Sequence, residues 1–186
     1  MRIIGGNFKG RKISLPNDKN TRPLRDLVKE SIFNIINHTY QNDLTINGSN
    51  VLDLFSGSGS FGLECFSRGS KSITFIENYE KAIEILKKNI LSLKAEKNCK
   101  IIEDDCFNFS NLKNNISFQF DLIFIDPPYK EKKINDIIDK ILENKLLKEH
   151  GLIIVHRHKS DDVVITQKLN ILDIRVYGIS RIIFGN

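Results

Sequence analysis

The 186-residue sequence has few cysteines and no long apolar segment. No run approaches the roughly 18 consecutive apolar residues of a membrane-spanning helix, which argues against an integral membrane protein. The N-terminal stretch MRIIGGNFKGRK lacks the apolar region of a secretory signal peptide, so we expect it to belong to the folded protein. Together with 40% hydrophobic and 27% charged residues, these absences predict one cytoplasmic globular domain over residues 1–186.

The three cysteines, Cys65, Cys99 and Cys106, are odd in number, and no two have CxxC spacing. This argues against a disulfide framework and against a structural zinc site. We expect Cys65 and Cys99 to be small buried side chains in a reducing compartment.

Positive charge is concentrated at the N-terminus. Residues 1–30 contain eight lysines and arginines against three acidic residues, whereas the other residues contain twenty of each sign. A basic face on an otherwise balanced protein favours a polyanionic partner, most often a nucleic acid, over a solvated surface that binds nothing. The segment before residue 50 combines two β-prone stretches separated by glycines, at 2–4 and 12–14, with a helical pattern that follows Pro23.

From residue 50 onward, short apolar segments alternate with amphipathic ones. Strands are expected at 51–55, 72–76, 100–102, 120–125 and 152–155, with helical patterns at 79–93 and 134–142 between them. Such alternation predicts an α/β fold with a parallel sheet covered by helices on both faces. Two further apolar segments, split by Gly178, predict a closing antiparallel hairpin.

The first chemical motif is a glycine-rich turn, DLFSGSGSFG over residues 53–62, between a predicted strand and a predicted helix. Its G-x-G-x-x-G pattern lets a ligand approach the main chain, and Glu77 at the end of the next strand can accept hydrogen bonds from ribose hydroxyls. The motif fits a dinucleotide or S-adenosylmethionine (SAM). Asp53 and the pair Asp104-Asp105 favour SAM, because acidic side chains suit its sulfonium and ammonium groups and repel a pyrophosphate.

The second motif is Asp126-Pro127-Pro128-Tyr129, directly after the fourth strand. The two prolines are rigid and offer carbonyl oxygens without N–H groups, so together with the aspartate they form a cluster of hydrogen-bond acceptors. Such a cluster suits a planar amino group, and Tyr129 can stack on the attached ring. Acceptors on both N–H groups favour rehybridisation of a weakly nucleophilic amine and align its nitrogen with a methyl sulfonium.

Four stretches together resemble one known family: MRIIGGNFKGRKI, TRPLRDLVKESIFNII, VLDLFSGSGSFGLECFSRGS and FDLIFIDPPY. They are similar to the RsmD family of 16S rRNA (guanine-N2)-methyltransferases, which are class I SAM-dependent enzymes. The resemblance covers essentially the whole chain and is weakest at residues 95–120 and 156–175. It implies a Rossmann-like, mostly parallel seven-stranded sheet with an antiparallel C-terminal hairpin and a small N-terminal extension made of a β-hairpin and a helix. A SAM-binding catalytic core would occupy residues 50–186, and a basic RNA-recognition extension residues 1–40.

The resemblance also implies roles for individual residues. The expected SAM-binding residues are Asp53, Phe55, Gly57, Gly59, Glu77, Asp105 and Cys106; the target base would be held by Asp126, Pro127, Pro128 and Tyr129; and RNA phosphates would be met by Lys9, Arg11, Lys12, Arg22 and Arg25. The implied reaction is methylation of one guanine amino group, at position 966 in rRNA numbering, on assembled or nearly assembled small ribosomal subunits. We expect a monomer that uses no metal ion and does not bind membranes.

The chain departs from the family pattern in two places. His156-Arg157-His158 stands where many members have an acid near the end of the fifth strand, and it is either an RNA contact or a lineage variant. We do not expect His156 to act as a catalytic base, because the chemistry does not demand one. Asp104 replaces an expected glycine and Cys106 an expected alanine, which leaves open whether Asp104 or Asp105 meets the adenine.

Three other functions remain possible from the sequence. One is a methyltransferase for an adenine amino group or a protein glutamine, although such relatives often carry Asn where this chain has Asp126 and usually bring a separate recognition domain. Another is a non-catalytic RNA-binding assembly protein, which the complete glycine turn, Glu77 and DPPY disfavour. The last is a dinucleotide-dependent oxidoreductase, which DPPY and the terminal hairpin disfavour.

Overall fold

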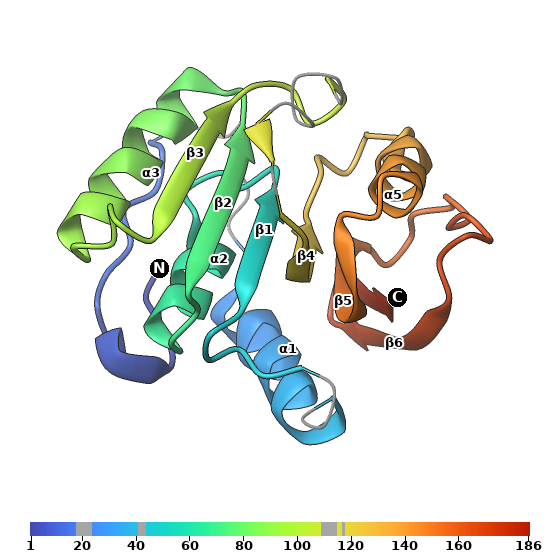
Figure 1. The fold of residues 1–186 in the computed structure, drawn as a ribbon, viewed down its shortest axis with the longest axis horizontal. Coiled ribbons are helices and arrows are strands. Elements are labelled where there is room, and N and C mark those ends of the chain that lie inside the picture. The colour runs from blue at the N-terminus through green and yellow to red at the C-terminus, as the bar shows by residue number, and fades with distance from the viewer. Residues whose placement is uncertain (18–23, 41–43, 109–114, 117) are drawn as a thin grey trace.

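The computed structural model describes residues 1–17, 24–40, 44–108, 115–116 and 118–186. Seven strands form one sheet in the order β3-β2-β1-β4-β5-β7-β6. The strands are β1 (Asn50–Leu54), β2 (Ser72–Glu77), β3 (Cys99–Glu103), β4 (Phe120–Ile125), β5 (Leu147–His158), β6 (Ile171–Tyr177) and β7 (Ser180–Gly185). β1 to β5 pair in parallel, and β7 pairs antiparallel with both β5 and β6, which confirms the predicted fold class (Figure 1).

Helices cover both faces of the sheet. The α-helices of the described residues are α1 (Asp26–Thr39), α2 (Ser60–Ser67), α3 (Glu80–Ser92) and α5 (Ile134–Glu143). The first three pack with one face of the strands in a hydrophobic cluster that includes Phe33, Phe61, Leu86 and Phe124. α5 packs on the other face, where its isoleucines meet side chains such as Ile123 and Val155. The alternation of cluster membership along each strand follows from the two-residue period of β structure.

The predicted N-terminal hairpin is reduced to an isolated antiparallel bridge between Arg2 and Lys12. Between these residues the chain turns through a short 3₁₀ helix, η1 (Gly6–Phe8), because Gly6 and Gly10 both adopt positive φ angles. The predicted helix after Pro23 is α1. Among the described residues, no helix is long and apolar enough to cross a membrane.

A buried ionic cluster holds the N-terminal segment against α2. The Glu64 carboxylate accepts hydrogen bonds from the backbone amides of Ile4 and Gly5, both at 2.8 Å, and from Arg68 Nε at 2.9 Å. Lys29 Nζ lies 3.4 Å from the same carboxylate and donates to the Arg2 carbonyl at 2.9 Å. The Lys29 pKa is lowered, because burial outweighs the attraction of Glu64. Lys29 and Glu64 are thus buried as a pair, which anchors the basic segment to the sheet-covering helices.

Candidate active site

The candidate site lies where the strand order reverses, between β1 and β4. Parallel pairing sets Leu54 beside Ile125 and Ile125 beside Val155, so the residues that follow, Asp126 and His156, lie next to one another. Alternation along the strands places Asp53, Glu77, Asp126 and His156 on the face covered by α2 and α3. Ligands of open α/β sheets bind in this position, at the carboxyl ends of the strands.

The glycine turn connects β1 to α2 and leaves its backbone open. Gly57 has a φ of +54° and a hypothetical Cβ there would meet nothing within 4 Å, so the position has both a glycine conformation and room for a ligand. At Gly62 a Cβ would lie 2.4 Å from the Phe75 ring, so this glycine allows α2 to pack closely on β2. Ser56 Oγ is buried and has no hydrogen-bond partner among the described residues. A ligand with a polar group could satisfy it.

Glu77, at the end of β2, is almost completely buried and holds the glycine turn. Its Oε2 accepts a 2.7 Å hydrogen bond from the Gly57 amide, and its Oε1 accepts from the amides of Asn78 and Tyr79 at 3.0 and 2.9 Å. Each carboxylate oxygen can accept more than one hydrogen bond, so these contacts leave acceptor capacity for a ligand. The predicted ribose acceptor is therefore also the residue that fixes Gly57.

Asp53 lies deeper in the site and is only 1% exposed. Its Oδ2 accepts a 2.9 Å hydrogen bond from the Gly62 amide in the first turn of α2. Burial raises the pKa of Asp53 well above its usual value, and the nearby carboxylates of Asp126 and Glu77 raise it further, against the opposing effect of the Gly62 hydrogen bond. A cationic ligand beside Asp53 would stabilise its charged form.

Asp126 begins the DPPY segment and is bonded by a side chain of β5. Its Oδ1 lies 2.7 Å from His156 Nδ1, and His156 Nε2 lies 2.9 Å from Ser180 Oγ at the start of β7. The Oδ2 atom has no hydrogen-bond partner among the described residues. The Tyr129 ring meets the His156 ring edge-on, with 6.1 Å between centroids. The predicted base-holding segment is thus flanked by His156.

One cavity of about 590 Å³ brings most of these residues together. This volume lies within the usual range for small-molecule and cofactor sites. The lining residues are Leu15, Leu24, Arg25, Asp53, Phe55, Ser56, Gly57, Ser58, Ser60, Phe61, Glu77, Asn78, Tyr79, Phe124, Asp126, Pro127, Pro128, Tyr129, His156, Ile179 and Ser180. The glycine turn, the acid of β2, the DPPY segment and part of the N-terminal extension therefore share one space.

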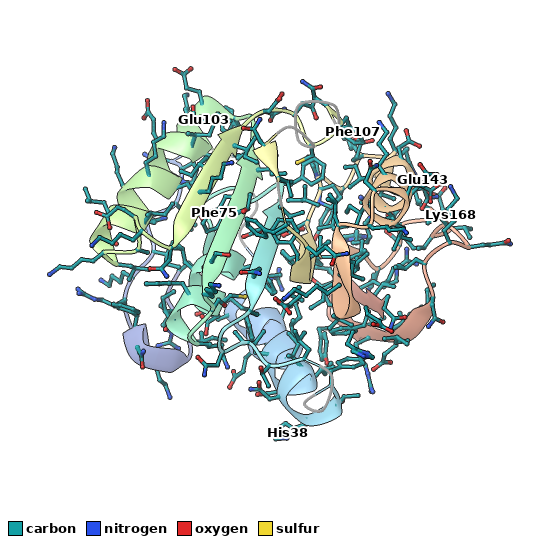
Figure 2. All side chains as sticks on the ribbon, viewed as in Figure 1. His38, Phe75, Glu103, Phe107, Glu143 and Lys168 are labelled. Carbon is teal, nitrogen blue, oxygen red and sulfur yellow. The ribbon has the colours of Figure 1, made fainter. Side chains whose placement is uncertain are left out.

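The predicted adenine-binding residues lie outside this lining. Asp105 is exposed, and its Oδ1 accepts a hydrogen bond from the Phe107 amide at 2.9 Å. Asp104 accepts from the Asp105 amide at 2.7 Å. Cys106 is buried, and burial raises the pKa of its thiol. Both acids thus accept hydrogen bonds within their own loop. The adenine contact of Asp105, with Asp104 as the alternative, stays a prediction. Phe107 lies beyond the carboxyl end of β3 (Figure 2), with its ring 6.0 Å from that of Phe55.

The predicted RNA-binding residues are spread along the N-terminal segment. Lys9, Arg11, Lys12 and Arg25 are exposed, and Arg25 also lines the cavity, whereas Arg22 lies outside the described residues. Asn89 of α3 ties this segment to the site, because its side chain pairs with the backbone of Ser14 and donates to the Ser58 carbonyl at 2.9 Å. The basic segment is therefore fixed at the rim of the cavity.

Sequence reasoning missed several residues of the cavity. Nothing in the sequence pattern marks Leu15, Leu24 or Ser180 as part of a site. His156 departs from the family pattern, but the sequence does not identify it as a partner of Asp126. The register of β4 and β5 could have revealed this contact. Ile125 pairs with Val155, so the residues that follow them, Asp126 and His156, lie side by side. Gly59 caps α2 and does not line the cavity.

Comparison with known proteins shows which family and which solved structures this chain resembles. The model of the family described as "Conserved hypothetical protein 95" matches residues 1–186. Ribosomal RNA small subunit methyltransferase D of Haemophilus influenzae is 33% identical over 181 residues, which cover 96% of this chain and 90% of that protein. The solved structure of yhhF from Escherichia coli superposes with a TM-score of 0.83 at 27% identity and covers 100% of this chain and 96% of that one.

A more distant structure, SMU.776 complexed with SAH, has a TM-score of 0.61 at 20% identity and covers 81% of this chain and 49% of that one. At this identity the likeness concerns the fold alone. The family model and the relative from Haemophilus influenzae are stronger evidence. The family model matches the whole chain, and the relative is 33% identical over 96% of this chain. The chain therefore belongs to the RsmD family, in which several relatives, including the one from Haemophilus influenzae, are named ribosomal RNA small subunit methyltransferase D.

Proposed function

We propose that this protein is a SAM-dependent rRNA methyltransferase that methylates the exocyclic N2 amino group of one guanine in 16S rRNA, at position 966 by family resemblance. The observation that carries the proposal is the single cavity shared by the glycine turn, Glu77 and the DPPY segment. It offers room for a cofactor and for a base side by side. The relative from Haemophilus influenzae, named for methylation of small-subunit rRNA, supports the same acceptor.

The residues of the cavity fit SAM. The open backbone at Gly57 and the unpartnered Ser56 hydroxyl leave room and a hydrogen-bonding group for the ligand, and Glu77 has acceptor capacity for ribose hydroxyls. Asp53 would balance the ammonium group of the methionine end. When bound, SAM supplies an electrophilic methyl group on a sulfonium. SAH in the fold neighbour SMU.776 agrees with this choice of cofactor.

The DPPY segment would orient the target amine. Asp126 presents a carboxylate, and Pro127 and Pro128 contribute carbonyl oxygens without N–H groups. Guanine carries two adjacent donors, the N2 amino group and N1–H, whereas adenine carries an acceptor, N1, beside its amino group. A site edge made of acceptors therefore favours guanine. Tyr129 would stack on the base, which must be turned out of any helical stack to reach the cavity.

The remaining steps follow from the same contacts. The amine nitrogen would attack the methyl carbon of bound SAM as the bond between that carbon and sulfur breaks, and S-adenosylhomocysteine would leave as the neutral thioether. The surplus proton of the amine would pass to the Asp126 carboxylate or to water. Most of the rate would come from alignment and electrostatics, because no covalent intermediate is required. The basic extension at residues 1–40 would hold rRNA phosphates at the rim and set the register of the substrate. The small ribosomal subunit or a late assembly intermediate is the expected partner.

The test is methyl transfer from labelled SAM to free 16S rRNA and to small subunits from a strain lacking the modification, followed by mapping of the labelled nucleotide. We expect label on one guanine amino group, with more label on subunits than on free rRNA. Label on an adenine or on a protein glutamine would replace the proposed acceptor. SAM binding without any transfer would overturn the proposed substrate. Absence of SAM binding would favour a non-catalytic RNA-binding protein.

A further inference from the structure

The last residues of β5 lie against the DPPY segment and the residues just after it, and bond them at three points. His156 bonds the Asp126 side chain at 2.7 Å. Arg157 is fully buried and donates to the carbonyl of Glu131 at 2.7 Å, and more weakly to that of Tyr129 at 3.4 Å. Arg157 also forms an ion pair with Asp161. The arginine of this stretch is thus used inside the protein and is not available as an RNA contact.

The contact between Asp126 and His156 has a defined direction. A carboxylate only accepts hydrogen bonds, so the proton lies on Nδ1 of the histidine. The Ser180 hydroxyl can donate to Nε2 or accept from it, and so it satisfies the other nitrogen in either charge state of the ring. Both His156 and Ser180 are buried, at 5% and 4% exposure, which makes an unpaired ring nitrogen unfavourable. The three side chains therefore form one hydrogen-bonded chain from β7 through β5 to Asp126.

We propose that His156, held by Ser180, is a positioning residue that fixes Asp126 for methyl transfer. It occupies Oδ1 and so leaves Oδ2, which has no partner among the described residues, as the oxygen for the target amine. This inference rests on the proposed function, because it concerns the orientation of the group that would hold the base. His156 itself does not exchange a proton with the substrate in this arrangement.

The alternative is that His156 only fills space beside Tyr129. Two substitutions of similar polarity separate the two roles. The side-chain nitrogen of Asn occupies the position of Nδ1 in histidine, so His156→Asn can keep the hydrogen bond to Asp126. The amide of Gln reaches the position of Nε2, so His156→Gln can bond Ser180 but not Asp126. A purely structural role would not distinguish these variants in this order.

The experiment compares the wild type with H156N, H156Q and H156A in single-turnover methyl transfer to the accepted rRNA substrate, together with SAM affinity by calorimetry and thermal unfolding. We expect H156N to stay within about threefold of the wild-type rate. H156Q and H156A should lose about 10- to 100-fold, as misaligned reactants do, with SAM affinity unchanged. The matched controls are His150→Asn and His150→Gln, at an exposed position near the start of the same strand, which should leave the rate unchanged.

Equal rates for H156N and H156Q, or a wild-type rate in H156A, would overturn the proposal. The free protein supplies an independent readout, since the Nδ1 proton of His156 should appear in histidine ¹H–¹⁵N spectra and shift in D126N. An Nδ1 that carries no proton, or a signal unmoved by D126N, would refute the contact whichever acceptor is methylated. A wild-type protein that labels a different acceptor would refute the proposed guanine instead, and the histidine variants would then be ranked on that acceptor.

Discussion

The two halves of the cavity hold their carboxylates in different ways. On the β1–β2 side, Asp53 and Glu77 are bonded by backbone amides of the adjacent turns, within 20 residues of their own position in the chain. On the β4–β5 side, Asp126 is bonded by a side chain 30 residues away, which is itself held by Ser180 from β7. The first half is a local structure, whereas the second is assembled from three strands.

This difference matches the tasks proposed for the two halves. A cofactor of fixed shape needs a turn of fixed shape, and backbone amides that bind a carboxylate provide it with little dependence on distant residues. A base held for reaction needs one carboxylate oxygen in a definite orientation, which a cross-strand hydrogen bond can set. Substitutions on the two sides should therefore separate cofactor binding from methyl transfer.

The largest effect is expected on the β4 side. Asp126→Asn replaces an acceptor by a donor beside the target amine and also disturbs the contact with His156. We expect the rate of methyl transfer to fall by about 100-fold or more, as when one oriented polar group is removed from an active site, while SAM affinity is retained. Single-turnover assays and calorimetry on the same preparation measure both quantities. A loss of SAM affinity as large as the loss of rate would show that the halves are not separable.

The complementary change on the β2 side is Glu77→Gln. Gln keeps only one accepting side-chain oxygen, whereas three backbone amides now donate to the two oxygens of the carboxylate, so the variant can satisfy only part of the arrangement. We expect SAM affinity to fall about 10- to 100-fold, the range for hydrogen bonds to a charged group, with most of the rate recovered at saturating SAM. Titration of the rate with SAM measures this. A rate that stays low at saturation would assign Glu77 to the chemical step.

The local half could largely be anticipated from the sequence, whereas of the assembled half only the DPPY segment could be anticipated and its contact with His156 could not. The strand, the G-x-G-x-x-G turn and Glu77 all lie within residues 50–77, and the positive φ of Gly57 and the close packing at Gly62 follow from the motif. The seven-stranded sheet was also predicted, because apolar strands and amphipathic helices alternate clearly. By contrast, the contact between Asp126 and His156 depends on the register of two strands, which composition does not specify.

The N-terminal segment illustrates a second limit of prediction. Its basic residues were evident, but the buried pair of Lys29 and Glu64 was not, since a lysine on a helix and a glutamate on another are normally read as exposed. The predicted hairpin was reduced to a single bridge because the segment bonds Glu64 and Ser67 of α2 in place of a longer strand partner. Tertiary contacts therefore decided the local structure there.

The raised pKa of Asp53 predicts a smaller effect, in the pH dependence of SAM binding. An acid whose pKa is raised by folding stays protonated above pH 3.8, its unperturbed value, and loses its proton as the pH rises through the folded value. If Asp53 balances the SAM ammonium, affinity should increase with pH in that window, by at most about tenfold per pH unit. Asp53→Asn should remove this increase. Calorimetric titrations of both proteins from pH 4 upward measure it, and an identical pH dependence would exclude Asp53 as the responsible group.

The smallest effect is expected outside the cavity, on the basic extension. Lys9, Arg11 and Lys12 are exposed. If they bind phosphates, each substitution by Ala should make the negative slope of log RNA affinity against log salt concentration shallower by about one. The affinity for SAM should not change. Filter binding to 16S rRNA across a salt series measures the slope. Lys94→Ala and Lys97→Ala, exposed before the amino end of β3, are matched charge controls. An equal change of slope in these controls would attribute RNA binding to net charge. A change confined to the extension would place the RNA at the rim of the cavity, which Leu24 and Arg25 line.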